Sequence, residues 1–187
     1  MSTHAHAPHA KVLGLVLLTS LVLTGCSPLQ PSGRSSQADH AAASVAQFLA
    51  SRPASRTAVL KLAAADGNDN SGYNFDGYAN GQLVFTVPVG WTVEGVLTNS
   101  GMMPHSAIII SQQAQQTYDV STPVFPGAET PDPSQGAGMG QAQHFSFVAA
   151  KPGVYVIACG ISGHDADGMW DTLVVSAAAK APGVTRP

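Results

Sequence analysis

The chain of 187 residues has room for one domain with accessory segments, and only 10% of its residues are charged. It carries 8 basic and 11 acidic side chains, and because no basic residues are clustered, nucleic-acid binding has no electrostatic basis. Charged residues make up about a quarter of a typical domain. Since this chain has far fewer, we expect it to meet other proteins through short-range apolar contacts rather than by long-range attraction.

The first 25 residues have the features of an export signal. Lys11 is their only fixed charge, and the apolar run from Val12 to Leu23 is too short to span a bilayer comfortably. Leu23-Thr-Gly-Cys26 resembles the bacterial lipobox, at which the signal is cleaved and the cysteine receives a lipid. We therefore expect a lipoprotein signal at 1–25 and a lipid on Cys26, with a short membrane anchor or an ordinary export signal as alternatives. This predicts an extracytoplasmic, membrane-anchored protein on the periplasmic side or the cell surface.

The chain contains two cysteines, Cys26 and Cys159. If Cys26 is acylated, Cys159 is a lone thiol in an oxidising compartment, where disulfides are usual. Metal coordination would protect it, because a bound sulfur is held as the thiolate. A disulfide between the two cysteines is the alternative, and the place of Cys26 in a processing motif argues against it.

Residues 26–56 separate the signal from the predicted domain. The segment 27–38 is rich in Ser, Pro and Gln, which is typical of a flexible tether. Asp39 can cap a short helix over 40–50 that Pro53 would close, and Phe48 and Leu49 would dock it on the domain. A spacer fits the same residues, and the sequence does not decide between the two.

Seven apolar or β-branched segments in the predicted domain, 57–177, are expected to form strands. They are 57–63, 82–88, 91–99, 106–111, 144–149, 153–158 and 170–176. Short strands at this spacing predict an all-β sandwich or barrel. Residues 112–143, dense in Pro and Gly, predict a long loop around the sandwich with one short strand near Tyr118 to Ser121. Residues 178–187 are expected to be a tail.

The segment from Cys159 to Met169 places a thiolate, an imidazole and a thioether within eleven residues. Cys159 ends one predicted strand, His164 lies in a glycine-containing loop that permits tight turns, and Met169 precedes the next strand. His105 follows Pro104 in another connection between strands. Two histidines, one cysteine and a weak axial methionine form the ligand set of a blue-copper electron-transfer site. We therefore predict one copper ion bound by these four residues.

Each of these residues has a structural explanation when taken alone. His164 could be an exposed loop histidine, Met169 could be core packing, and His105 could cap a turn. Cys159 could be a small buried hydrophobe, as free cysteines commonly are. The spacing Cys-x4-His-x4-Met between two strands, with a Pro-His upstream, favours the metal site over the joint coincidence.

The segment Gly153 to Asp171 resembles the copper loop of cupredoxins, and of sulfocyanin-like proteins in particular. Tyr73-Asn-Phe-Asp-Gly-Tyr78, followed by Val87-Pro-Val-Gly-Trp91, is similar to the sulfocyanin N-terminal pattern. The resemblance covers 57–176 and implies a Greek-key β-sandwich that carries single electrons between respiratory redox proteins. Its partners would be redox proteins such as c-type cytochromes or a terminal oxidase. It also implies the same four copper ligands.

Residues near the ligands have supporting roles in this interpretation. Ser106 stands where many cupredoxins have Asn after the first histidine, and its hydroxyl and nearby amides are expected to brace the ligand loop and the Cys159 sulfur. Asn99 is expected to hydrogen-bond the loops, with a plain turn role as the alternative. An apolar collar around His164, through which electrons would pass and which a partner would contact, is expected from Met102, Met103, Met139 and Ile161.

Several functions compete for these residues. We favour a monomeric, lipid-tethered electron carrier that is not an enzyme. A copper chaperone or buffer that delivers copper to an oxidase is the main alternative, although such proteins usually have exposed Met- or His-rich sites. A copper enzyme would need further histidine clusters, and outside the signal only His40 and His144 remain beyond the ligands. A metal-free β-sandwich adhesion module is the last alternative.

Overall fold

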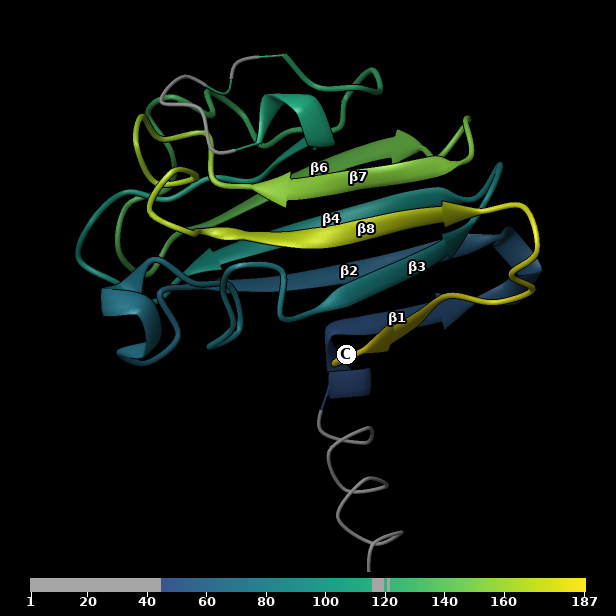
Figure 1. Cartoon of the computed structure of the whole chain (residues 1–187), viewed down its shortest axis with the longest axis horizontal. Coiled ribbons are helices and arrows are strands. Elements are labelled where there is room, and N and C mark those ends of the chain that lie inside the picture. The colour runs from purple at the N-terminus through teal and green to yellow at the C-terminus, as the bar shows by residue number, and fades with distance from the viewer. Residues whose placement is uncertain (1–44, 116–119, 121) are drawn as a thin grey trace, which may run out of the picture. The chain divides into compact units, whose positions relative to one another are not determined.

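Two β-sheets packed face to face make up the fold of the computed structural model, which describes residues 45–115, 120 and 122–187 (Figure 1). One sheet has the strand order β1-β2-β4-β6 and the other β5-β7-β8-β3-β9. The strands of the first sheet are β1 (Leu49–Arg52), β2 (Thr57–Ala64), β4 (Thr92–Asn99) and β6 (Ala142–Val148). Those of the second are β3 (Val84–Pro88), β5 (Ile108–Ser111), β7 (Gly153–Ala158), β8 (Trp170–Ser176) and β9 (Gly183–Thr185).

The core lies between the sheets and follows from the alternation of side chains along each strand. Buried and more exposed positions alternate strictly along β8 and largely along β2, so that Leu60 and Leu62 face Leu173 and the other strand residues of the opposite sheet across one hydrophobic cluster. Phe145 of β6 lies over Gly95 of β4, where an added Cβ would come within 2.1 Å of the ring. A glycine is therefore required where this aromatic ring fills the sheet surface.

The strand pairing places the two ends of the ligand segment side by side. β7 and β8 are antiparallel neighbours, with Ala158 paired to Trp170 at the end of the hairpin. The loop that joins them begins at Cys159 and ends at Met169. β2 pairs in parallel with β4 in the first sheet, and β3 pairs in parallel with β8 in the second. The chain therefore crosses from one sheet to the other several times before it enters this hairpin.

The predicted β-sandwich is confirmed, and each of the seven expected strand segments overlaps an observed strand, β2 to β8. Two strands were missed, β1 and β9, and they extend the sheets beyond the expected range 57–177. β1 pairs antiparallel with β2, and β9 pairs antiparallel with β3. In the described residues, no helix has the length and apolar character that crossing a bilayer requires.

Within the part of the range 40–50 that the structure describes, 45–50, only Val45 is α-helical, so the helix considered there does not extend beyond it. Ala46–Phe48 forms a single 3-10 turn, η1, and Leu49 begins β1. Leu49 is buried and pairs with Leu60. A short isolated helix is only marginally stable, whereas a strand at this edge gains ladder hydrogen bonds and buries Leu49. The expected tether residues and Cys26 lie outside the described residues.

The long segment 112–143 does cover the sandwich, as predicted. Val120 is buried in a second apolar cluster on the outer side of the β5–β7 pair, together with Ile108, Ile110, Val156 and Ala158. Its later part pairs with β5 through one isolated bridge, Ile108 to Glu129, in which Ile109 N–H donates to Ala128 O at 2.8 Å and Thr130 N–H donates to Ala107 O at 2.8 Å. The short strand expected near Tyr118 to Ser121 lies almost wholly outside the described residues.

Candidate metal centre

The loop between β7 and β8 is closed by its own backbone hydrogen bonds. Cys159 N–H donates to Met169 O at 3.1 Å, and Met169 N–H donates to His164 O at 2.9 Å. His164 N–H in turn donates to Ile161 O at 3.1 Å. These bonds fold the loop back on itself, so the three predicted ligands of this segment lie together at one end of the sandwich.

His105 reaches the same place from the connection between β4 and β5. Its N–H donates to Ala137 O at 3.1 Å, and its carbonyl accepts from Ala137 N–H at 2.7 Å. The neighbouring Gly136 has a φ of +69°, and a Cβ there would lie 2.7 Å from His105 O. This position therefore requires glycine both for its backbone conformation and for the close approach. Neither Gly136 nor Ala137 was predicted from the sequence to contact the site.

The side chains of the four predicted ligands converge. His105 Nδ1 lies 3.1 Å from Met169 Sδ and 4.0 Å from Cys159 Sγ, and His164 Nδ1 lies 3.4 Å from Cys159 Sγ. The candidate ligand atoms of the two histidines and the cysteine all lie within 4.8 Å of one another. All four residues are buried. The structure thus brings together residues that are as many as 64 positions apart in the chain.

These distances fit a single metal ion. With metal–nitrogen bonds of about 2.0 Å and metal–sulfur bonds of about 2.3 Å, donor atoms around one ion lie about 3 to 4 Å from each other. The three measured separations fall at or close to this range. Two imidazole nitrogens, a cysteine sulfur and a methionine thioether are also the donor set that suits copper in electron-transfer sites.

Burial controls the protonation of the candidate ligands. It lowers the pKa of His105 to about 4, with a smaller contribution from His164, and it lowers the pKa of His164 as well. Neutral imidazoles are the form that coordinates a metal. Burial raises the pKa of the Cys159 thiol, against the opposing effect of the Ser106 amide. A metal ion that binds this sulfur must therefore displace its proton.

Ser106 links the segment of His105 to the ligand loop. Its N–H donates to Cys159 Sγ at 3.4 Å, and its hydroxyl oxygen accepts from Gly160 N–H at 2.8 Å. The same hydroxyl lies 3.9 Å from the sulfur. Ser106 thus has the bracing position that the sequence analysis expected.

Asn99 organises the connection that carries His105. It is fully buried, and its Nδ2 donates to Met103 O at 2.7 Å and to Ala137 O at 2.8 Å. Its Oδ1 accepts from Gly101 N–H at 2.8 Å. One side chain therefore joins the start of the connection to the segment that pairs with His105, which is the loop-bridging role expected for it.

The three methionines of the expected collar are exposed. Met102 and Met103 line a cavity of about 490 Å³ together with His105, so this hollow lies beside His105. Met139 is also exposed, and Ile161 is partly buried against the core. The ring contacts of His164 are with His105, at a centroid distance of 5.0 Å, and with Tyr73, at 4.8 Å.

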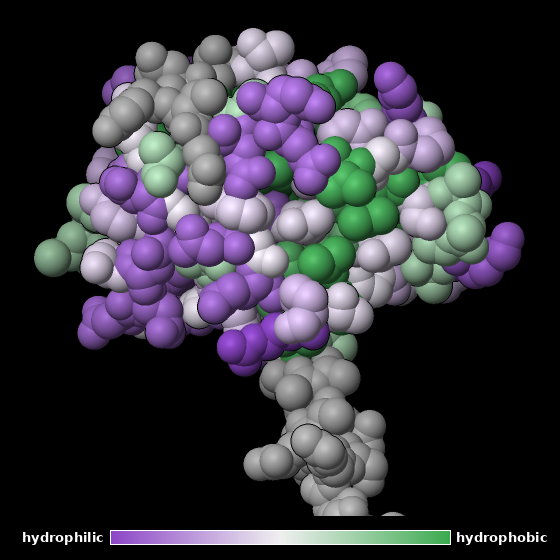
Figure 2. All heavy atoms as spheres, viewed as in Figure 1, coloured by the Kyte–Doolittle hydropathy of each residue, from purple (hydrophilic) through white to green (hydrophobic). Residues whose placement is uncertain are grey.

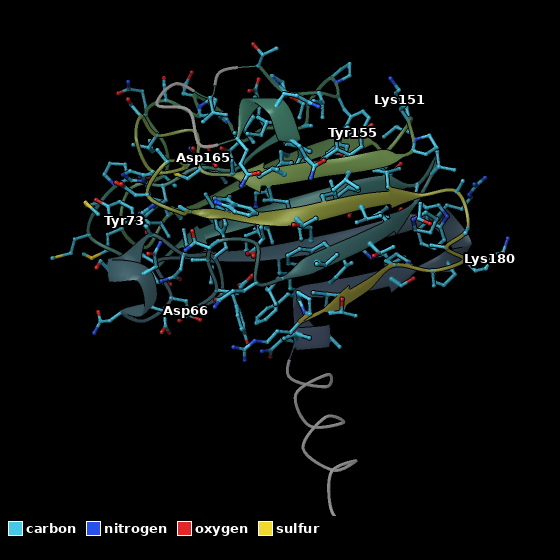
Figure 3. All side chains as sticks on the ribbon, in the orientation of Figure 1. Asp66, Tyr73, Lys151, Tyr155, Asp165 and Lys180 are labelled. Carbon is cyan, nitrogen blue, oxygen red and sulfur yellow. The ribbon has the colours of Figure 1, made fainter. Side chains whose placement is uncertain are left out.

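Tyr73 is a further residue near the site that was not singled out from the sequence. It appeared there only within the pattern Tyr73-Asn-Phe-Asp-Gly-Tyr78 and had no role assigned. Figure 3 labels it at the same end of the sandwich as Asp165 of the ligand loop. An aromatic residue in a polar turn was the available signal, but the turn lies more than 80 residues from His164 in the chain.

Comparison with known proteins settles the family. The sequence model of the Sulfocyanin (SoxE) domain matches residues 44–185, which is most of the chain. The chain belongs to the sulfocyanin family. It is similar to the sulfocyanin of Sulfolobus acidocaldarius, with 29% identity over 134 residues that cover 68% of this chain and 67% of the relative.

Solved structures of other copper proteins are also similar to the chain. Dithionite-reduced auracyanin from the photosynthetic bacterium Roseiflexus castenholzii has 23% identity and a TM-score of 0.47, over 65% of this chain and 98% of that one. A rusticyanin variant has 18% identity and a TM-score of 0.49, over 72% and 92%. The family match confirms the predicted family, and together with the two packed sheets and the cluster of His, Cys, His and Met it confirms the predicted fold class and the copper cofactor.

Proposed function

We propose that this member of the sulfocyanin family carries single electrons, with its copper held by His105, Cys159, His164 and Met169. The observation that supports this most strongly is the convergence of two Nδ1 atoms, one Sγ and one Sδ within a buried volume. The bound copper supplies the redox change, between Cu(I) and Cu(II). The protein supplies the geometry in which that change occurs.

Hydrogen bonds fix the proposed copper ligands both in the loop between β7 and β8 and in the connection that carries His105. The hydrogen bonds at the base of the ligand loop, Ser106 on Gly160, and the two bonds between His105 and Ala137 fix the ligand backbones. Such a framework resists rearrangement when the oxidation state changes, which keeps the barrier to electron transfer low. Amide donation to the Cys159 sulfur adjusts the reduction potential.

An electron carrier fits the described residues better than a copper enzyme does. Within the described ranges, the one group of three metal-binding side chains is His105, Cys159 and His164. The other histidine that the structure describes, His144, is exposed on β6. The closed and buried site also differs from the exposed sites expected of a copper chaperone. Colourless Cu(I) binding with ready transfer to an acceptor protein would favour that alternative.

Replacement of Cys159 tests the proposed function directly. We expect Cys159→Ala to abolish the strong visible absorption of the copper-loaded protein while the far-ultraviolet circular dichroism stays that of the folded protein, because the thiolate is the source of the colour. Cys26→Ala is the matched control and should keep the full visible spectrum. Visible absorption that survives in Cys159→Ala would contradict the ligand assignment.

We also propose that the protein acts outside the cytoplasmic membrane, anchored through lipid on Cys26, and exchanges electrons with c-type cytochromes or a terminal oxidase. The lipobox-like sequence supports the anchor, and the exposed Met102, Met103 and Met139 support a short-range apolar contact with a partner. Mass spectrometry of the membrane fraction should find acylated Cys26, and Cys26→Ala should move the protein to the soluble fraction. Unmodified Cys26 in the membrane fraction would contradict the anchor.

A further inference from the structure

The imidazole of His164 is covered by the ring of Tyr73. The two ring centroids lie 4.8 Å apart with an interplanar angle of 72°, an edge-to-face contact. His164 is only 8% exposed, whereas Tyr73 is partly exposed. At this contact, the group that a reagent or a partner protein meets first is therefore the phenol ring rather than the imidazole.

The turn that carries Tyr73 is tied to the ligand loop by one side chain. Asn70 Nδ2 donates to Tyr73 O at 2.8 Å and to Asp167 O at 2.8 Å. These two bonds join the turn to the loop only three residues after His164. Asn70 therefore fixes the Tyr73 backbone relative to the loop between β7 and β8, which carries the His164 ring that Tyr73 contacts.

The backbone of this turn is strained. Asn70 and Ser71 both have positive φ values, +48° and +57°, in the left-handed region that non-glycine residues adopt at a cost. Figure 2, drawn in the orientation of Figure 3, shows mainly hydrophilic residues around the place where Tyr73 is labelled. A strained polar turn thus presents one aromatic ring over a copper ligand, which plain core packing does not require.

We propose that Tyr73 is the aromatic port of the site: its ring shields His164 and is the surface group through which electrons pass, while Asn70 positions it. This deepens the proposed function and rests on it for the electron-transfer part. One electron leaves a reduced donor such as a c-type cytochrome and tunnels through the Tyr73 and His164 rings to the oxidised copper. No bond forms or breaks, and the tyrosine itself is not oxidised.

Shielding can be measured on the copper-free, full-length chain. Diethyl pyrocarbonate modification of His164, located by mass spectrometry, should be faster in Tyr73→Leu by about fivefold, the factor that corresponds to the loss of one edge-to-face ring contact. Asn70→Gly removes both amide bonds and relieves the backbone strain, and it should accelerate the reaction in the same direction. Tyr78→Leu is the control, because the Tyr78 ring contacts Phe48 and Arg186 instead. Equal rates in Tyr73→Leu and the wild type would overturn the shield.

Electron passage is measured on the copper-loaded protein. Tyr73→Phe, which keeps the ring, should be reduced by cytochrome c at the wild-type rate, whereas Tyr73→Leu should lose rate several-fold with an unchanged visible spectrum and reduction potential. An unchanged rate in Tyr73→Leu would refute the port. A shifted potential in Tyr73→Phe would also refute it, because the residue would then act on the ligand geometry. Wild-type protein without visible absorption would instead refute the proposed function, and the shielding measurement would still stand.

Discussion

At the scale of single residues, the site is defined by what surrounds the Cys159 sulfur. The Ser106 amide, both imidazoles and the Met169 thioether approach one another in a buried space. The thioether is the weakest donor of this set, and in sites of this kind the axial ligand tunes the reduction potential. Its replacement should therefore change the potential while the other three ligands keep the copper.

We predict that Met169→Leu retains copper and raises the reduction potential, because a weak donor that favours the more positive oxidation state is lost. Leucine has a similar volume, so the buried packing should survive with a cost below about 1.5 kcal/mol. A redox titration followed by visible absorption measures the change. Met102→Leu is the control, since Met102 is 90% exposed, and it should leave the potential unchanged. A lower potential in Met169→Leu would contradict the axial assignment.

At the scale of elements, the segment 124–137 fixes the backbone of His105 by hydrogen bonds. Val124, Ala128 and Thr130 bond to the backbone of Ile109 or Ala107, and Ala137 bonds to His105 itself. This places a loop, rather than a regular strand, beside the proposed ligand His105. Gly136 permits the approach, because a side chain there would meet the His105 backbone.

We predict that Gly136→Ala displaces His105 and lowers the free energy of unfolding by about 1–3 kcal/mol through overpacking, in addition to the cost of a positive φ. Gly140→Ala is matched for backbone conformation, with a φ of +74° and nothing within 4 Å of an added Cβ. It should show only the conformational cost and an unchanged copper spectrum. Denaturant unfolding and electron paramagnetic resonance of both variants provide the comparison. Identical spectra for the two variants would contradict the steric argument.

At the scale of the whole molecule, buried carboxyl groups lie in both halves of the sandwich. Asp76 accepts from Ala63 N–H at 2.8 Å beside β2, and Asp171 of β8 accepts from Leu83 N–H at 2.9 Å. Burial raises the pKa of Asp76 from 3.8 to about 7; the hydrogen bond from Ala63 opposes this shift, and the charge of Asp66 adds slightly to it. Burial also raises the pKa of Asp171, and the charge of Asp76 adds to this.

The raised pKa of Asp76 makes the free energy of unfolding depend on pH. Because the folded-state pKa of Asp76 lies above its unfolded value, the folded protein holds the proton more tightly than the unfolded chain does. The stabilisation is fully present below about pH 4 and is lost as the pH rises through about 7. A shift of about three pKa units corresponds to about 4 kcal/mol at most.

We predict that between pH 4 and pH 7 the free energy of unfolding of the wild type falls relative to that of Asp76→Asn, because the opposite contribution of His105 is common to both proteins. Asparagine keeps an acceptor for Ala63 N–H and has no proton to lose. Urea unfolding at a series of pH values measures the difference between the two proteins, so that copper-dependent effects common to both cancel. Asp69→Asn, at an exposed position, should retain the wild-type slope. Parallel pH profiles for the wild type and Asp76→Asn would disprove the account.

Much of the fold followed from local patterns. The apolar, β-branched runs at 153–158 and 170–176 predicted β7 and β8. β1 and β9 escaped prediction because they are three or four residues long and acquire their strand conformation only by pairing with β2 and β3. The residues around Leu49 have a helix-compatible composition, and the tertiary pairing overrides it.

The sequence by itself determined the metal, its four candidate ligands and the family, because a cysteine, a histidine and a methionine at short spacing between two strands carry specific chemistry. The tertiary structure alone decided what surrounds them: Ala137 on the His105 backbone, Met102 and Met103 beside His105, and Tyr73 over His164. The physical reason is that ligand chemistry depends on residue type and local spacing. The shielding of a ligand depends instead on contacts between segments far apart in the chain, which no local pattern encodes.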